Sequence, residues 1–226
     1  ADADAALRAS VEAARSAVEA SGRPVRVAAS VGPYGAILHD GSEYRGRYDL
    51  SSRQLTDFHR ERIEVLLEEG PDLLAVETIP DLDEAVAILE VLRDVEVPAW
   101  LTFSAADGEH LNAGQRIEEA AAVAADSGLV MAVGINCTEP AYLPALLARM
   151  SATTDLPLVV YPNAGGQWDP TDGEWHGGAL VQGSSLFTIA EIQDWQTAGA
   201  RAIGGCCGTD AASIRQIALA LAAPAG

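Results

Sequence analysis

The three cysteines of this chain are the residues whose types and positions most clearly predict chemistry. Cys206 and Cys207 are adjacent in the stretch GGCCGT, and Cys137 ends the apolar stretch VMAVGINC. Thiolates are soft ligands that select zinc, and three protein ligands leave a fourth position open for water or substrate. The wide separation along the chain is unlike the close CxxC pairs of structural zinc sites. Converging cysteines would therefore form a catalytic zinc site.

Other interpretations of these residues stay open at this point. A small buried side chain at a strand end accounts equally well for Cys137 taken alone. A disulfide between the adjacent Cys206 and Cys207 is disfavoured in a reducing cytosol. A phosphate-binding barrel would use Gly204 and Gly205, but it leaves the cysteine pair unexplained.

Polar residues at other predicted strand ends are candidate substrate contacts. Glu77 follows five mostly apolar residues in DLLAVE, and packing does not explain a carboxylate at this position. The alternative is a solvated carboxylate or an ion pair at the rim of the barrel. Asn136 precedes Cys137, and Asn163 lies in YPNAGG. Both asparagines are predicted to bind substrate or to support metal ligands, although both are also ordinary turn formers.

Helices and short apolar strands alternate along the chain and must position these residues. Helical periodicity with stop signals predicts helices at 3–20, 52–69, 82–93, 115–125, 142–150, 188–198 and 210–222. Apolar runs predict strands at 26–30, 72–78, 99–104, 130–137, 156–163 and 202–207. Strands that are buried on both faces and joined by crossover helices indicate a parallel sheet.

This alternation favours an α/β fold, a (β/α)8 TIM-type barrel with six of its eight βα units present. An open doubly wound sheet is the alternative, but no GxGxxG or GxxxxGK[ST] sequence supports its nucleotide-binding form. The long connections 31–50 and 164–187 follow strands and should lie at the carboxyl-terminal face, where such folds carry their chemistry. All three cysteines end predicted strands, so we expect them on that face, with the glycines around Cys206 and Cys207 permitting an unusual backbone.

Length and charge limit the classes of function. The chain has 226 residues, with 33 acidic and 14 basic side chains and a formal net charge of -19. These values favour one domain spanning residues 1–226, and they disfavour nucleic-acid and anionic-membrane partners. No apolar run approaches a membrane span and no secretory signal precedes the first helix. We therefore expect a soluble, cytoplasmic protein.

Five motifs, in order along nearly the whole chain, carry a family resemblance: SVGPYGAILHDGSEYRGRY, LLAVETIP, VGINC, LVVYPNAGG and GARAIGGCCGT. Together they resemble the homocysteine S-methyltransferases, in particular the branch that uses S-methylmethionine or S-adenosylmethionine. The resemblance implies a barrel whose zinc is held by Cys137, Cys206 and Cys207. It also implies methyl transfer from a sulfonium donor to the thiolate of L-homocysteine, giving methionine, with Glu77 holding the homocysteine amino group.

A zinc ion would remove the main difficulty of this reaction, because a free thiol is only a few per cent thiolate at neutral pH. Aromatic residues on the long connections are predicted either to face the sulfonium by cation-π attraction or to cap the barrel mouth: Tyr34, Tyr44, Trp168 and Trp175. The histidines lack HxH or HExxH spacing, so none is predicted as a ligand, and His59 is predicted on a helix surface.

The chain departs from the family pattern at its beginning. The family barrel starts with a strand that ends in an Asp-Gly-Gly type motif, and neither it nor the second strand is present. We therefore expect the native polypeptide to be longer, and a homo-oligomer could cover the exposed sheet edges. The alternative function is a non-catalytic fragment or paralogue that binds zinc or homocysteine. Of the possible donors, S-methylmethionine is favoured by resemblance alone.

Overall fold

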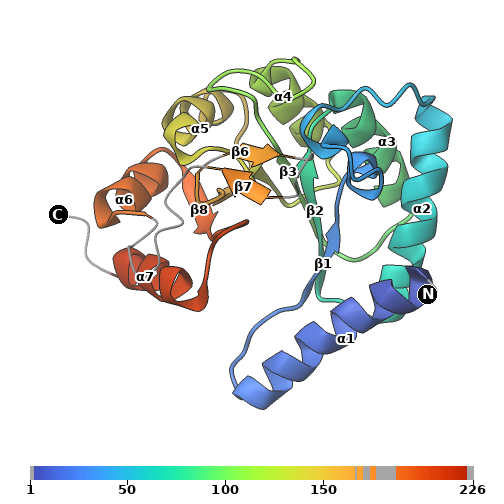
Figure 1. Ribbon diagram of the computed structural model, residues 1–226, viewed down its shortest axis with the longest axis horizontal. Coiled ribbons are helices and arrows are strands. Elements are labelled where there is room, and N and C mark those ends of the chain that lie inside the picture. Colours follow the sequence, from blue (N-terminus) through green and yellow to red (C-terminus); the bar gives the residue numbers. More distant parts are fainter. Residues whose placement is uncertain (1–2, 166, 170–173, 177–186, 223–226) are drawn as a thin grey trace.

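A parallel sheet of six strands forms the centre of the molecule (Figure 1). The structure is a computed structural model that describes residues 3–165, 167–169, 174–176 and 187–222. The strands lie in the order β1-β2-β3-β4-β5-β8. Their bounds are β1 (Ala28–Val31), β2 (Leu73–Ile79), β3 (Ala99–Phe103), β4 (Ala132–Asn136), β5 (Leu158–Tyr161) and β8 (Ala200–Ile203). A separate antiparallel pair is formed by β6 (Gln167–Asp169) and β7 (Glu174–His176).

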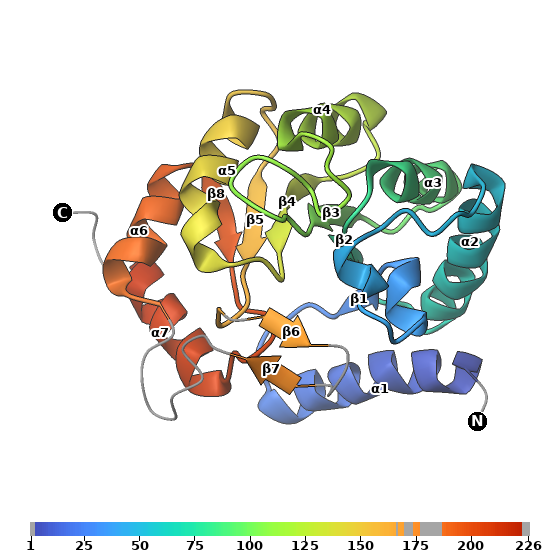
Figure 2. The ribbon, with the colours of Figure 1, turned by 45° about the horizontal axis from the view of Figure 1, so that its top comes forward.

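Helices follow the strands in sequence and surround the sheet from α2 to α7 (Figures 1 and 2). The α-helices are α1 (Ala3–Ser21), α2 (Ser52–Glu68), α3 (Leu82–Leu92), α4 (Ile117–Ser127), α5 (Leu143–Ser151), α6 (Ile189–Thr197) and α7 (Ala211–Ala222). Short 3-10 helices are η1 (Tyr34–Ile37), η2 (Ser42–Tyr44) and η3 (Pro140–Tyr142). This arrangement confirms the predicted α/β fold with six βα units.

Local sequence signals explain where the helices begin. Ser51 and Gln54 form a capping box at the start of α2, and Thr188 and Glu191 form another at α6. The Asp81 carboxylate caps α3 by accepting the Asp83 N–H. The predicted helix boundaries therefore agree with the structure to within about two residues, which is the usual uncertainty of helix ends.

The structure corrects the prediction for His59. Its side chain is fully buried, and Nε2 lies 2.8 Å from Oε1 of Glu84 on α3. His59 follows Leu55 and precedes Ile63 at helical spacing, so it falls on the buried stripe of α2. A buried polar partner from the neighbouring helix makes this position acceptable for a histidine.

Within the described part of the chain, β1 and β8 form the two edges of the sheet. None of the described helices is long and apolar enough to cross a membrane. The strands end together at one side of the sheet, where the connections after β1, β4, β5 and β8 meet. The predicted functional residues lie at that side.

Candidate metal centre

The three cysteine sulfurs lie together at the carboxyl ends of β4 and β8. The Sγ atoms of Cys137 and Cys207 are 3.5 Å apart, and those of Cys206 and Cys207 are 3.9 Å apart. All three atoms lie within 4.8 Å of one another. Tetrahedral zinc with Zn–S bonds of about 2.3 Å places its sulfur ligands about 3.8 Å apart. The spacing of the sulfurs therefore fits a tetrahedral metal ion.

Backbone hydrogen bonds from the end of β5 hold the cysteine-bearing segments in place. β5 lies between β4 and β8 in the sheet. The Tyr161 carbonyl accepts the Cys137 N–H at 3.1 Å, and the Pro162 carbonyl accepts the Cys206 N–H at 2.9 Å. The Ala164 N–H donates to the Cys207 carbonyl at 2.9 Å. One short segment thus fixes cysteines that are far apart in sequence.

Unusual backbone conformations let the adjacent cysteines converge. β8 ends at Ile203, earlier than predicted, so Cys206 and Cys207 lie in a turn rather than on opposite faces of a strand. A Cβ atom on Gly205 would overlap Thr209, which explains the glycine at that position. Cys137 has a positive φ of 48°, a strained conformation that is common at functional sites.

The thiols influence one another's protonation. Hydrogen bonds to the other two cysteines, together with burial, raise the pKa of Cys137. Hydrogen bonds from Cys137 and Cys206 lower the pKa of Cys207. One sulfur therefore carries negative charge more readily than its neighbours, and ionising all three requires a cation among them.

Glu77 lies near the end of β2, and side chains from β1 and β5 donate hydrogen bonds to its two carboxylate oxygens. Ser30 donates to Oε1 at 2.5 Å and Tyr161 donates to Oε2 at 3.0 Å. Trp100 donates in turn to the Tyr161 hydroxyl oxygen at 3.0 Å. Burial and the charge of Glu77 raise the pKa of Tyr161 above its ordinary value, so its hydroxyl remains a donor.

Asn136 is fully buried, and its amide joins β2 to β4. Its Oδ1 accepts the Thr78 backbone N–H at 2.7 Å, and its Nδ2 donates to the Thr78 hydroxyl at 2.7 Å. Thr102 donates to Asn136 Oδ1 at 2.9 Å and lies 2.8 Å from the Tyr161 hydroxyl. Thr78 has a positive φ of 61°, so Asn136 holds a strained residue beside Glu77. Its predicted contact with substrate stays a prediction.

Asn163 lies near the cysteines, in the turn after β5. Its side-chain oxygen accepts the Gly165 N–H at 2.9 Å, and its backbone N–H donates to the Thr138 carbonyl at 3.2 Å. This is the geometry of an Asx turn. A substrate contact by Asn163 also stays a prediction.

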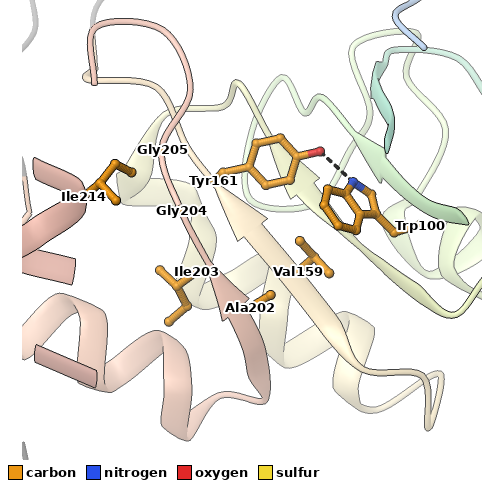
Figure 3. A pocket seen from close by; sticks show the side chains of 8 residues that line it. All are labelled: Trp100, Val159, Tyr161, Ala202, Ile203, Gly204, Gly205 and Ile214. Carbon is orange, nitrogen blue, oxygen red and sulfur yellow. Dashed lines mark hydrogen bonds between the residues drawn. The ribbon is translucent and has the colours of Figure 1, made fainter. Parts of the chain in front are cut away.

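A cavity of about 280 Å³ adjoins Tyr161 (Figure 3). Figure 3 shows the Tyr161 ring and its hydrogen bond from Trp100 at one side and the Gly204 and Gly205 backbone at another. The remaining lining is mostly apolar: Val159, Ala202, Ile203 and Ile214. The cavity thus lies between Tyr161, which donates a hydrogen bond to Glu77, and the segment that leads to Cys206.

The aromatic residues of the first long connection have different surroundings. Tyr44 directs its hydroxyl to Cys137 Sγ at 3.1 Å. Tyr34 packs against Phe58, with ring centroids 5.0 Å apart. The side chains of Trp168 and Trp175 lie outside the described residues, although their backbones pair across β6 and β7.

Sequence reasoning missed the partners of Glu77 and Asn136, namely Ser30, Thr78, Thr102 and Tyr161. For Thr102 and Tyr161, the sequence signal is the alternation of side chains between the two faces of β3 and β5. Trp100 and Thr102 are two residues apart, as are Val159 and Tyr161, so each pair shares a face of its strand. On that face Tyr161 contacts the Glu77 carboxylate, and Thr102 contacts Asn136 and Tyr161.

Fold and site together define an α/β protein with a three-cysteine candidate metal centre at the carboxyl ends of parallel strands. The sequence profile described as homocysteine S-methyltransferase matches residues 1–221. The chain belongs to the homocysteine S-methyltransferase family.

Curated relatives and a solved structure agree with this assignment. Homocysteine S-methyltransferase YbgG of Bacillus subtilis (strain 168) is 44% identical over 193 residues, which are 85% of this chain and 60% of that protein. Selenocysteine Se-methyltransferase of Brassica oleracea var. italica is 43% identical over 199 residues, 86% of this chain and 57% of that protein. The metallated crystal structure of the homocysteine methyltransferase MmuM from Escherichia coli has a TM-score of 0.81 and 41% identity, covering 95% of this chain and 69% of that chain. The chain thus spans about 60% of the length of these curated relatives.

Proposed function

We propose that this protein transfers a methyl group from a sulfonium donor, S-methylmethionine in the first instance, to the thiolate of L-homocysteine, giving methionine. The observation that carries the proposal is the convergence of Cys137, Cys206 and Cys207 within 4.8 Å at the strand ends. Zinc is the proposed metal, because three thiolate ligands in tetrahedral spacing suit it and leave a fourth position for a substrate. Family membership supports methyl transfer to homocysteine.

The cysteines would hold the metal, with Cys207 the thiol most easily ionised. When bound, zinc supplies a Lewis acid that favours the thiolate form of a thiol entering the site. The strained backbone at Cys137 and the turn at Cys206 and Cys207 fix the sulfurs before a metal arrives. Such fixed geometry reduces the cost of ordering the site on metal binding.

Glu77 is the proposed ligand for the homocysteine ammonium group. Ser30 and Tyr161 both donate hydrogen bonds to its carboxylate, which fixes the orientation of that carboxylate. The cavity beside Tyr161 can take part of a small substrate. A substrate held through its ammonium group at Glu77 would have its sulfur end available to the cysteine cluster.

The test is methionine formation from homocysteine and S-methylmethionine by the zinc-loaded protein. Glu77→Gln should raise the homocysteine KM by about 10-fold or more, because a charged hydrogen bond is lost. The matched control is Glu64→Gln, which makes the same change at an exposed position on α2 and should leave KM unchanged. Zinc binding without any methionine formation would instead support a non-catalytic zinc-binding or homocysteine-binding protein.

The same assay can compare methyl donors and methyl acceptors. S-adenosylmethionine should be compared with S-methylmethionine as donor, because the two differ in size around the same sulfonium centre. Selenocysteine should be compared with homocysteine as acceptor, because one relative is named for that activity. A cytoplasmic location and a homo-oligomeric state remain predictions for the intact protein.

A further inference from the structure

Tyr44 is the only tyrosine of the described residues with a hydrogen bond to a cysteine of the candidate metal centre. Its hydroxyl lies 3.1 Å from Cys137 Sγ, and its side chain is half-buried in η2. A phenol is protonated at neutral pH, so it acts as a donor toward a thiolate. The contact comes from the connection after β1, which is far from Cys137 in sequence.

A buried carboxylate on α3 fixes the connection that carries Tyr44. Glu84 is fully buried and accepts the Tyr34 backbone N–H at 2.6 Å and the Tyr48 hydroxyl at 3.1 Å. His59 from α2 contacts the same carboxylate at 2.8 Å. We call Glu84 with Tyr34, Tyr48 and His59 the Glu84 anchor. Since Tyr34 and Tyr48 lie on either side of Tyr44 in sequence, the anchor restrains both flanks of η2.

Further contacts restrict the segment close to Tyr44. Asp81 accepts the Arg47 backbone N–H at 2.9 Å, and the Arg47 side chain donates to the Ala113 carbonyl at 2.6 Å. A Cβ on Gly35 would lie 2.5 Å from the backbone of Ser42, so η1 and η2 pack in direct backbone contact. These contacts hold the backbone on both sides of Tyr44 and thereby limit where its hydroxyl can lie.

We propose that Tyr44 is a positioning residue of the metal centre, whose hydroxyl donates a hydrogen bond to the Cys137 sulfur and stabilises the thiolate that holds the metal. The inference rests on the proposed zinc centre. Three thiolates around a divalent ion leave a net negative charge, which a donated hydrogen bond stabilises. The same bond lowers the energy of the sulfur lone pair and orients the Cys137 side chain.

The test uses the protein loaded with cobalt(II), which accepts the same thiolate ligands and absorbs light by sulfur-to-cobalt charge transfer. Tyr44→Phe removes the hydroxyl and keeps the ring. Loss of the hydrogen bond raises the sulfur lone pair in energy, so the charge-transfer band should move to longer wavelength. Tyr44→3-fluorotyrosine has a more acidic phenol and should move the band to shorter wavelength. Tyr142→Phe, the same deletion on η3, should leave the band in place.

Zinc affinity gives a second readout. The dissociation constant of Tyr44→Phe should rise by about 10-fold to 100-fold, as for other groups that hydrogen-bond to metal ligands. A cobalt spectrum and zinc affinity equal to those of the unchanged protein would overturn the role of Tyr44 while leaving the metal centre intact. Failure of the unchanged protein to bind cobalt or zinc would instead overturn the proposed metal centre, and the two failures are thereby distinguished.

Discussion

The cysteine cluster (Cys137, Cys206 and Cys207) and the Glu84 anchor both contact the connection after β1, but they differ in how their charges are balanced. In the anchor, one buried carboxylate faces three donors from the protein. In the cysteine cluster, three like groups face one another, with sulfurs 3.5 and 3.9 Å apart. The Glu84 carboxylate finds its hydrogen-bond donors within the protein, whereas the cluster reaches full ionisation only with a cation. Buried polar contacts can thus stabilise the fold in one place and form a ligand site in another.

The largest expected effect is on catalysis. Cys207→Ser replaces a proposed thiolate ligand by a hydroxyl, so the proposed metal-dependent methionine formation should fall on the order of 1,000-fold or more, as several kcal/mol of Lewis-acid stabilisation are lost. Denaturant unfolding of the metal-free variant should stay close to that of the metal-free parent. A variant with full activity would contradict the assignment of Cys207 as a ligand.

Glu84→Ala should affect folding instead. It leaves the fully buried His59, the half-buried Tyr48 hydroxyl and the Tyr34 N–H without their acceptor, which should reduce the free energy of unfolding by about 3–5 kcal/mol. Urea unfolding measures this loss. Glu90→Ala is the control, because Glu90 lies on the same helix and is exposed. Equal stability of the two variants would mean that the Glu84 carboxylate does not stabilise the fold.

The affinity of the cysteine cluster for a metal ion should depend on pH. The raised pKa of Cys137, and that of Cys206 at about 11, mean that both thiols are protonated at neutral pH. Metal binding must release these protons, so affinity falls as pH falls, by up to about 100-fold per pH unit when two protons are released. Competition titrations with a chromophoric chelator measure the slope. An affinity independent of pH between about 6 and 8 would contradict thiol ligation.

The smallest expected effect concerns the Glu84 anchor itself. Tyr48→Phe removes one of the three donors to Glu84 and should lower the free energy of unfolding by only about 1–2 kcal/mol. Urea unfolding beside Tyr142→Phe gives the matched comparison. A loss as large as that of Glu84→Ala would mean that the Tyr48 hydroxyl, rather than the carboxylate, dominates the anchor.

The fold and the cysteine convergence could be predicted because both depend on local pattern. Helical periodicity and apolar runs indicated the βα alternation, and parallel strands bring their carboxyl ends to one edge. The prediction for His59 was wrong: the spacing of α2 places it on the buried stripe between Leu55 and Ile63, and only its partner, a carboxylate on another helix, lies outside the sequence of α2. The hydrogen bond from Tyr161 to Glu77 likewise joins residues on non-adjacent strands, whose proximity depends on the curvature of the sheet.

Zinc titration of the metal-stripped protein, followed by thiol alkylation and mass analysis, tests the three-cysteine metal centre most directly. We expect one zinc per chain and simultaneous protection of Cys137, Cys206 and Cys207 from alkylation. Saturable zinc binding that leaves any of the three cysteines as reactive as in the metal-free protein would contradict a three-cysteine metal centre.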